Sequence, residues 1–144
     1  MHLAQLNLAD AIADMESPIM ADFVNNTDRI NALGAKHPGY IWSLEERPEA
    51  EKENRVAIFG KESLLVNMTV WKDRDSLFDF VYKTAHKDIM IRKKEWFTKM
   101  PKMHMVLWYV PEGHQPTISE GKERLEHLRA HGESEYAFSF KSKY

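Results

Sequence analysis

Two segments in which apolar and polar side chains alternate constrain the fold of this chain most strongly. In residues 2–8, positions 4, 6 and 8 are alanine or leucine, whereas Gln5 and Asn7 stand between them. In residues 64–71 every even position is apolar, and the odd positions include Asn67 and Thr69. A period of two indicates strands that bury one face and leave the other partly polar. We therefore expect a sheet built around these two strands.

Helices and further strands are predicted around these segments. Ser17 and Pro18 suit the N-cap and the first position of a helix that should end near Gly34. Asp73 can cap a second helix, and a further helical stretch follows it. Strands are also predicted at 40–44 and 103–110, a third helix at 119–131 and a last short strand at 136–140. This order predicts the α+β class: a ferredoxin-like βαββαβ fold with an extra C-terminal helix and strand.

The stretch from Glu45 to Arg55 is interpreted as a loop between two strands. It is charged along most of its length and contains Pro48. Such a composition is typical of exposed connections. We therefore expect an exposed, mobile hairpin loop here.

The ferredoxin-like arrangement places both of its helices on one face of the sheet, so the other face needs a cover. The face that carries Gln5, Asn7, Asn67, Thr69 and Trp71 is interpreted as the open one. A second copy packing sheet to sheet would cover it and enclose a partly polar cavity. The sequence therefore predicts a homodimer closed into an α/β-barrel.

The composition limits the classes of function. The chain has 144 residues, which suits a single domain over 1–144, and its formal net charge of −2 favours neither nucleic acid nor an anionic membrane. It has no cysteine, which excludes disulfides and thiol catalysis. The N-terminus lacks the pattern of a signal peptide, and no apolar run is long enough to span a bilayer. A cytoplasmic location without a membrane partner is expected.

Motifs spread over most of the chain carry a resemblance to a known family. They are Leu3-Ala4-Gln5-Leu6-Asn7, Trp71-Lys72-Asp73 with Leu77 and Phe80, His86, Arg92, Trp96-Phe97, Leu107-Trp108-Tyr109-Val110-Pro111, Gly113-His114, Pro116-Thr117 and Ala137-Phe138-Ser139-Phe140. The sequence resembles a bacterial family of the dimeric α/β-barrel superfamily, whose relatives include the antibiotic-biosynthesis monooxygenases. The resemblance implies the fold and the dimer, but it implies no particular substrate.

The best candidate site combines His86, Arg92, Trp96 and Phe97. His86 could act as a general base near neutral pH, and Arg92 could hold a carboxylate or phenolate. Arg92 and Trp96 are four residues apart, so they share one face of a helix, and Trp96 with Phe97 could wall an aromatic ligand. The alternative is structural, with the aromatic rings in the core and Arg92 in an ion pair.

Further polar and aromatic residues are candidates for the same ligand site. Asn67 lies among apolar neighbours, so it either lines a wet cavity or hydrogen-bonds across strands. Trp42 and Trp108 either frame that cavity or pack in the core. His127 and His131 have the spacing of a helical metal pair but lack a third ligand, so an exposed helix face is favoured and no metal is expected.

The expected function is therefore that of a small-molecule-binding protein. One hypothesis is a cofactor-independent, monooxygenase-like enzyme that acts on an aromatic or anionic substrate, with His86 as acid or base. The alternative is a ligand-binding or sensory module without turnover. Haem binding through His86 or His104 is the weakest alternative, because a lone histidine is weak evidence.

Overall fold

A computed structural model describes residues 1–84 and 86–144, apart from the side chain of Glu53. Its centre is an antiparallel sheet in which β1 (His2–Ala11) is the middle strand. One edge of β1 pairs with β3 (Leu64–Trp71), and β2 (Tyr40–Ser43) pairs with the far side of β3. The other edge of β1 pairs with β5 (Met105–Val110) and, at its end, with the two-residue β4 (Phe97–Thr98). This strand order confirms the predicted ferredoxin-like α+β fold.

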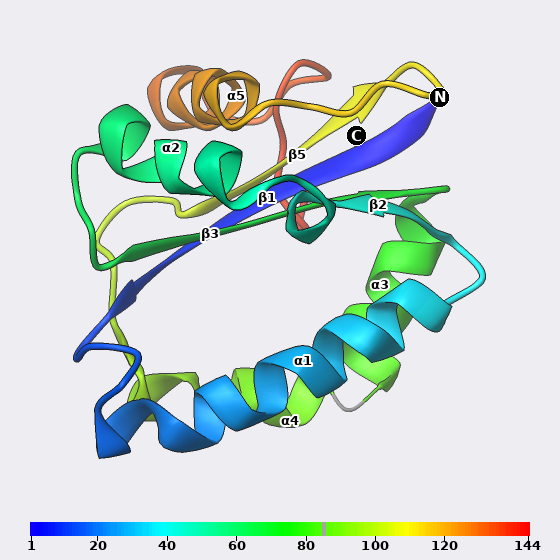
Figure 1. The fold of residues 1–144 in the computed structure, drawn as a ribbon. Helices are drawn as coiled ribbons and strands as arrows, with labels where there is room; N and C mark the ends of the chain where they lie inside the picture. The colour runs from blue at the N-terminus through cyan, green and yellow to red at the C-terminus, as the bar shows by residue number, and fades with distance from the viewer. Residues whose placement is uncertain (85) are drawn as a thin grey trace.

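Helices cover both faces of the sheet (Figure 1). One layer holds α1 (Ala21–Lys36), α3 (Arg74–Lys83) and α4 (His86–Ile91), and we name the sheet face beneath it the α1 face. The opposite layer holds α2 (Glu49–Phe59) and α5 (Ile118–His131), and we name that side the α5 face. Short 3-10 turns lie at Pro18–Met20, Leu44–Glu46 and Lys93–Glu95.

The helix starts follow from capping residues in the sequence. Ser17 Oγ accepts a hydrogen bond from the Ile19 amide and begins the turn that leads into α1. Asp73 accepts from the Ser76 amide at the start of α3, as predicted. Thr117 does the same for α5 by accepting from the Glu120 amide. Each cap satisfies an amide that has no partner inside its helix.

The alternating strands separate two hydrophobic cores. The α5-face core collects Ala4, Leu6, Leu8, Trp42, Leu44, Leu64, Met68, Val70, Val106, Trp108, Val110, Ile118, Leu125, Leu128 and Ala137. The α1-face core collects Leu3, Ile30, Trp71, Leu77, Phe80, Val81, Leu107 and Phe138. The even positions of β1 and β3 thus point to α5, whereas the odd positions point to α1. The predicted division of residues between the two faces is confirmed.

The predicted mobile loop at 45–55 is wrong. Residues 44–46 form a 3-10 turn whose Ser43 and Glu46 make a capping box, and α2 begins at Glu49 directly after Pro48. Ile58 and Phe59 near the end of α2 pack against the α5-face core, and Lys122 of α5 donates to the Ile58 carbonyl at 2.7 Å. Ile58 and Phe59, just beyond the predicted loop, thus fix the end of α2 on the α5-face core.

The expectation of an open sheet face holds only around Asn67, which is exposed. Residues of α1 and α3 pack over the Trp71 end of the α1 face, and the chain's own α2 and α5 cover the other face. The reason given for a dimer therefore does not hold, although the subunit number itself stays a prediction.

The C-terminal strand is smaller than predicted. It is reduced to one antiparallel bridge, between Phe138 and Leu107. Within the described residues, no helix is both long and apolar enough to cross a membrane.

Candidate functional site

A hydrogen-bonded row of polar side chains crosses the α1 face of the sheet. Gln5 Nε2 donates to Asn67 Oδ1 at 2.8 Å and to Thr69 Oγ1 at 3.0 Å. The same Thr69 oxygen accepts from Trp71 Nε1 at 2.8 Å. Register places Gln5 directly opposite Thr69, and Asn7 opposite Asn67, which brings these side chains together. Gln5 is only 7% exposed, and this pairing satisfies its amide nitrogen in the interior.

The row ends at a part of the sheet that the helical layer leaves open. Asn67 is exposed, and it lies beyond the end of β2, whose pairing with β3 stops at Ser43 opposite Thr69. Its neighbours Asn7 and Leu65 on the same face are half-buried. Because Asn67 Oδ1 accepts from Gln5, the amide NH2 group of Asn67 is directed away from the row. The site therefore presents a hydrogen-bond donor at an open part of the sheet.

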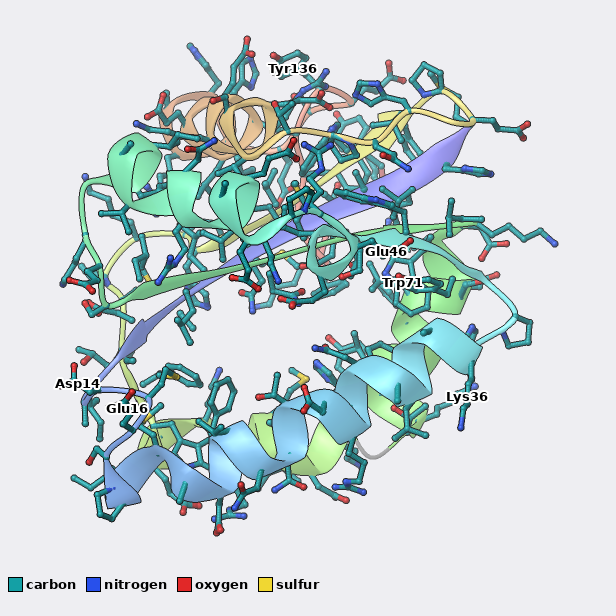
Figure 2. The ribbon with its side chains drawn as sticks, viewed as in Figure 1. Asp14, Glu16, Lys36, Glu46, Trp71 and Tyr136 are labelled. Atoms are coloured by element: carbon teal, nitrogen blue, oxygen red, sulfur yellow. The ribbon has the colours of Figure 1, made fainter. Side chains whose placement is uncertain are left out.

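Aromatic rings continue the row toward α4. Figure 2 shows Trp71 between the sheet and the α1 layer, where its ring stacks on Phe80 at 5.1 Å between centroids. Phe80 in turn lies 5.1 Å from the ring of His86. Gly34 of α1 allows this arrangement, because a Cβ there would lie 3.3 Å from Phe80 Cζ. Contacts thus run without a break from Asn67 through Gln5, Thr69, Trp71 and Phe80 to His86.

His86 lies at the start of α4 with its ring largely inside the protein. Burial lowers the pKa of His86, and a hydrogen bond with the Val81 backbone opposes this effect in part. Its Nδ1 atom is buried and has no hydrogen-bond partner. A neutral imidazole with an unused nitrogen is a competent proton acceptor.

Arg92 is already paired within the chain. Its guanidinium donates to Glu95 at 2.9 and 3.0 Å and to Asp22 at 2.8 Å, and it lies 4.8 Å over the Trp96 ring. Trp96 is 1% exposed and contacts Phe23, which also meets Phe97 edge to face at 4.9 Å. The structure thus brings together three of the four residues of the predicted site, Arg92, Trp96 and Phe97. His86 contacts Phe80 instead and shares no hydrogen bond or ion pair with Arg92.

Trp42 and Trp108 do not lie near the other predicted ligand-binding residues. They are 3% and 0% exposed and belong to the α5-face core, on the opposite side of the sheet from Asn67. Arg47 lies over the Trp42 ring at 4.9 Å. His104, the other histidine considered for haem, precedes β5, and burial lowers its pKa. These residues do not share a surface with Asn67.

His127 and His131 do lie side by side on α5, with ring centroids 4.7 Å apart. Tyr136 packs on the His127 ring at 4.6 Å. Among the described residues, no three histidine or carboxylate side chains are grouped as a metal site would require.

Two features of the structure carry little local signal in the sequence. Alternation marks Gln5 only as a polar residue of one face, because its partners are 62 and 64 residues away. Glu120 is not among the predicted residues, yet its carboxylate accepts from Trp108 Nε1 at 2.9 Å and contacts His114 Nε2 at 2.7 Å. The Thr117-x-x-Glu120 spacing is the available signal, since it is that of a capping box.

Comparison with known proteins agrees with this architecture. The chain belongs to the family described as Domain of unknown function (DUF3291), which it matches over residues 2–144. No curated protein matches it significantly. The structure is similar to that of a conserved protein from Methanosarcina mazei Go1, at 15% identity and a TM-score of 0.55, covering 77% of this chain and 94% of that one.

A second similar structure is that of a mutant of SnoaB, a cofactor-independent oxygenase from Streptomyces nogalater. The identity is 17% and the TM-score 0.51, over 80% of this chain and 97% of that one. At such identities both likenesses concern the fold alone.

Proposed function

We propose that the α1 face around Asn67 binds a small aromatic molecule that carries a carbonyl or phenolate oxygen. The observation that carries this proposal is the amide of Asn67, which is oriented by Gln5 and exposed on the α1 face beyond the end of β2. An amide NH2 is a hydrogen-bond donor, so it suits an acceptor oxygen. Half-buried Leu65, two residues away on the same face of β3, supplies apolar surface beside that amide.

We further propose that the bound molecule is oxidised by O2 without a cofactor, as the name of the Streptomyces enzyme states for that protein. A CH2 group beside the oxygen-bearing ring loses a proton, and the resulting carbanion adds O2 at carbon to give a hydroperoxide after protonation. Loss of water leaves a new C=O. The CH2 group and O2 thus become C=O and H2O, and the substrate supplies every electron. Donation from Asn67 to the ring oxygen stabilises the anion that forms.

His86 is proposed as the proton acceptor. Its lowered pKa keeps the imidazole neutral at pH 7, and its Nδ1 is unused. Contact between His86 and the Asn67 row passes only through the buried rings of Phe80 and Trp71, so this role requires a movement that opens His86 Nδ1 to the substrate. The Arg92 guanidinium already pairs with Glu95 and Asp22, so it could bind a ligand anion only by weakening one of these ion pairs.

The second candidate is ligand binding without turnover. It is favoured by the separation of His86 from Asn67, since a base beside the ligand oxygen is not part of the row. A homodimer also stays a prediction, and because α2 and α5 cover the α5 face of the sheet, a second copy would not pack directly on that face. Light scattering at micromolar concentration measures the subunit number, and a single mass of one chain would exclude the dimer.

Oxygen uptake with anthrone tests the enzymatic proposal. Anthrone is a tricyclic aromatic ketone with an acidic CH2 group. We expect one O2 consumed per anthraquinone formed, a rate reduced by about tenfold or more in Asn67→Ala, and a lower rate in His86→Gln. The same rate in all three proteins and in buffer would reject catalysis. Binding of anthrone with no O2 uptake would favour the module without turnover.

A further inference from the structure

We infer that Gln5 is a positioning residue that sets the hydrogen-bond polarity of the Asn67 site, and so decides that the site takes an acceptor oxygen rather than a donor group. This inference rests on the proposed function for the identity of the ligand site. It goes beyond it by naming a residue that is buried beneath the site and determines its specificity.

The geometry gives Gln5 this role because both hydrogens of its amide are used. One goes to Asn67 Oδ1 and the other to Thr69 Oγ1. Trp71 Nε1 can only donate, so Thr69 Oγ1 receives a second hydrogen bond from the indole. Because its oxygen accepts from Gln5 and is turned toward the row, Asn67 directs its NH2 group outward and presents a donor first to a ligand.

Burial makes this orientation costly to change. Gln5 is 7% exposed and Trp71 is 1% exposed, so a lost hydrogen bond there is not replaced by bulk water. Asn67, by contrast, is exposed and has no comparable packing to hold its amide. The buried Gln5, which the ligand does not contact, therefore fixes the orientation of the exposed Asn67 amide.

A carboxylate at position 5 should reverse the direction of the hydrogen bonds in the row. In Gln5→Glu the side chain has the same shape but accepts hydrogen bonds instead of donating them. It would accept from the Asn67 amide and the Thr69 hydroxyl, which turns Asn67 Oδ1 toward the ligand. The site would then repel an acceptor oxygen. Asn67→Asp gives a similar result without a buried charge, since an aspartate presents an oxygen in either orientation.

The probe is para-nitrophenol, whose absorption distinguishes its neutral and ionised forms. In the wild-type protein we expect the bound probe to ionise at lower pH than the free probe, because Asn67 donates to its oxygen. Asn67→Ala should abolish this shift. Gln5→Glu should reverse its direction and weaken phenolate binding by about tenfold or more. Gln5→Met, which neither donates nor accepts, should leave an intermediate affinity and serves if Gln5→Glu does not fold.

Asn7→Asp is the matched control for charge. Asn7 lies opposite Asn67 on the same face, but it makes no hydrogen bond to the row within the described chain. A carboxylate there repels phenolate by charge alone. The role of Gln5 is refuted if Gln5→Glu and Asn7→Asp change the ionisation of the bound probe equally. It is also refuted if, in Gln5→Glu, the bound probe still ionises at lower pH than the free probe, as in the wild type. If instead the wild type does not bind the probe, or Asn67→Ala binds it unchanged, the proposed ligand site fails.

Side-chain amide exchange measured by NMR tests Gln5 without any ligand. The Gln5 NH2 protons should be protected, since both are donated inside the protein, whereas the Asn67 NH2 protons should exchange rapidly. Protected Asn67 protons together with rapidly exchanging Gln5 protons would overturn the inference whatever the probe does.

Discussion

The guanidinium of Arg92 donates to both carboxylate oxygens of Glu95, from Nε at 2.9 Å and from Nη2 at 3.0 Å. This is the bidentate geometry in which arginine binds carboxylates best. The same Nη2 also reaches Asp22 of α1, so the pair ties the segment after α4 to the start of α1. Paired in this way, Arg92 fits the structural alternative considered from the sequence.

Replacing Arg92 by Ala should therefore lower the melting temperature slightly and leave probe binding nearly unchanged. The fall is expected to be small because these ion pairs are exposed. Thermal unfolding and para-nitrophenol titration measure the two effects. Glu95→Gln is the matched control, since it weakens the same pair from the other side. Lost probe binding at an unchanged melting temperature would instead assign Arg92 to the ligand.

Acidification should destabilise the protein through His86. Burial lowers the pKa of His86 in the folded state, whereas the unfolded chain titrates near its usual value of about 6.5. Below that pH the unfolded state binds the proton more readily, so the free energy of unfolding falls as the pH falls toward the folded pKa. Urea denaturation from pH 8 downward should show a shallower loss for His86→Gln.

His104 contributes in the same direction, because burial lowers its pKa as well. The His104→Gln variant therefore serves as a reference for how much one buried histidine changes the pH dependence of the free energy of unfolding. Equal pH dependence in the wild type and in His86→Gln would show that His86 is not buried as neutral imidazole.

Removing the Glu120 carboxylate should destabilise the α5 face. Trp108 is 0% exposed and its indole NH donates to Glu120 Oε2, so Glu120→Ala leaves a buried donor unpaired. The expected loss in free energy of unfolding is about 1–3 kcal/mol. Glu120→Gln keeps an acceptor for the indole and should lose less. Urea denaturation followed by tryptophan fluorescence measures both, and equal stability of Glu120→Ala and wild type would contradict the contact.

Gly60 provides a test of whether α2 is a helix. It ends α2 in the left-handed conformation, with φ of 74°, and a Cβ added there would meet no atom within 4 Å. Gly60→Ala should therefore cost about 1 kcal/mol through backbone strain alone. Gly60→Asn should cost less, because asparagine tolerates this conformation. Urea denaturation compares the variants. In a mobile loop the alanine would stabilise the protein slightly instead, by restricting the unfolded chain.

Much of the fold could be predicted because its signals are local. Alternation in β1 and β3 and the capping residues Ser17 and Asp73 act over a few neighbours, and these elements lie where they were expected. The segment at 49–59 could not be recognised in this way. It is charged, and its helix depends on Ile58 and Phe59 meeting α5, which is distant in sequence.

The candidate site divides in the same way. Arg92 and Trp96 were predicted to share one face of a helix. Their side chains do meet, but α4 ends at Ile91 and the two residues flank the 3-10 turn Lys93–Glu95, so the predicted helix through Trp96 is wrong. The partner Asp22 lies 70 residues away from Arg92, and nothing in local spacing selects it.

By itself, the sequence determined which side chains share a face of each strand, because a strand places alternate residues on opposite sides. Only the tertiary structure decided which helices cover which face. That choice depends on apolar surfaces brought together from distant segments, here α2 and α5 over Trp108 and α1 and α3 over Trp71. It also decided that Gln5 holds Asn67, since the register between β1 and β3 joins residues 62 positions apart. The arrangement of the Asn67 site thus depends on long-range packing, which local periodicity does not encode.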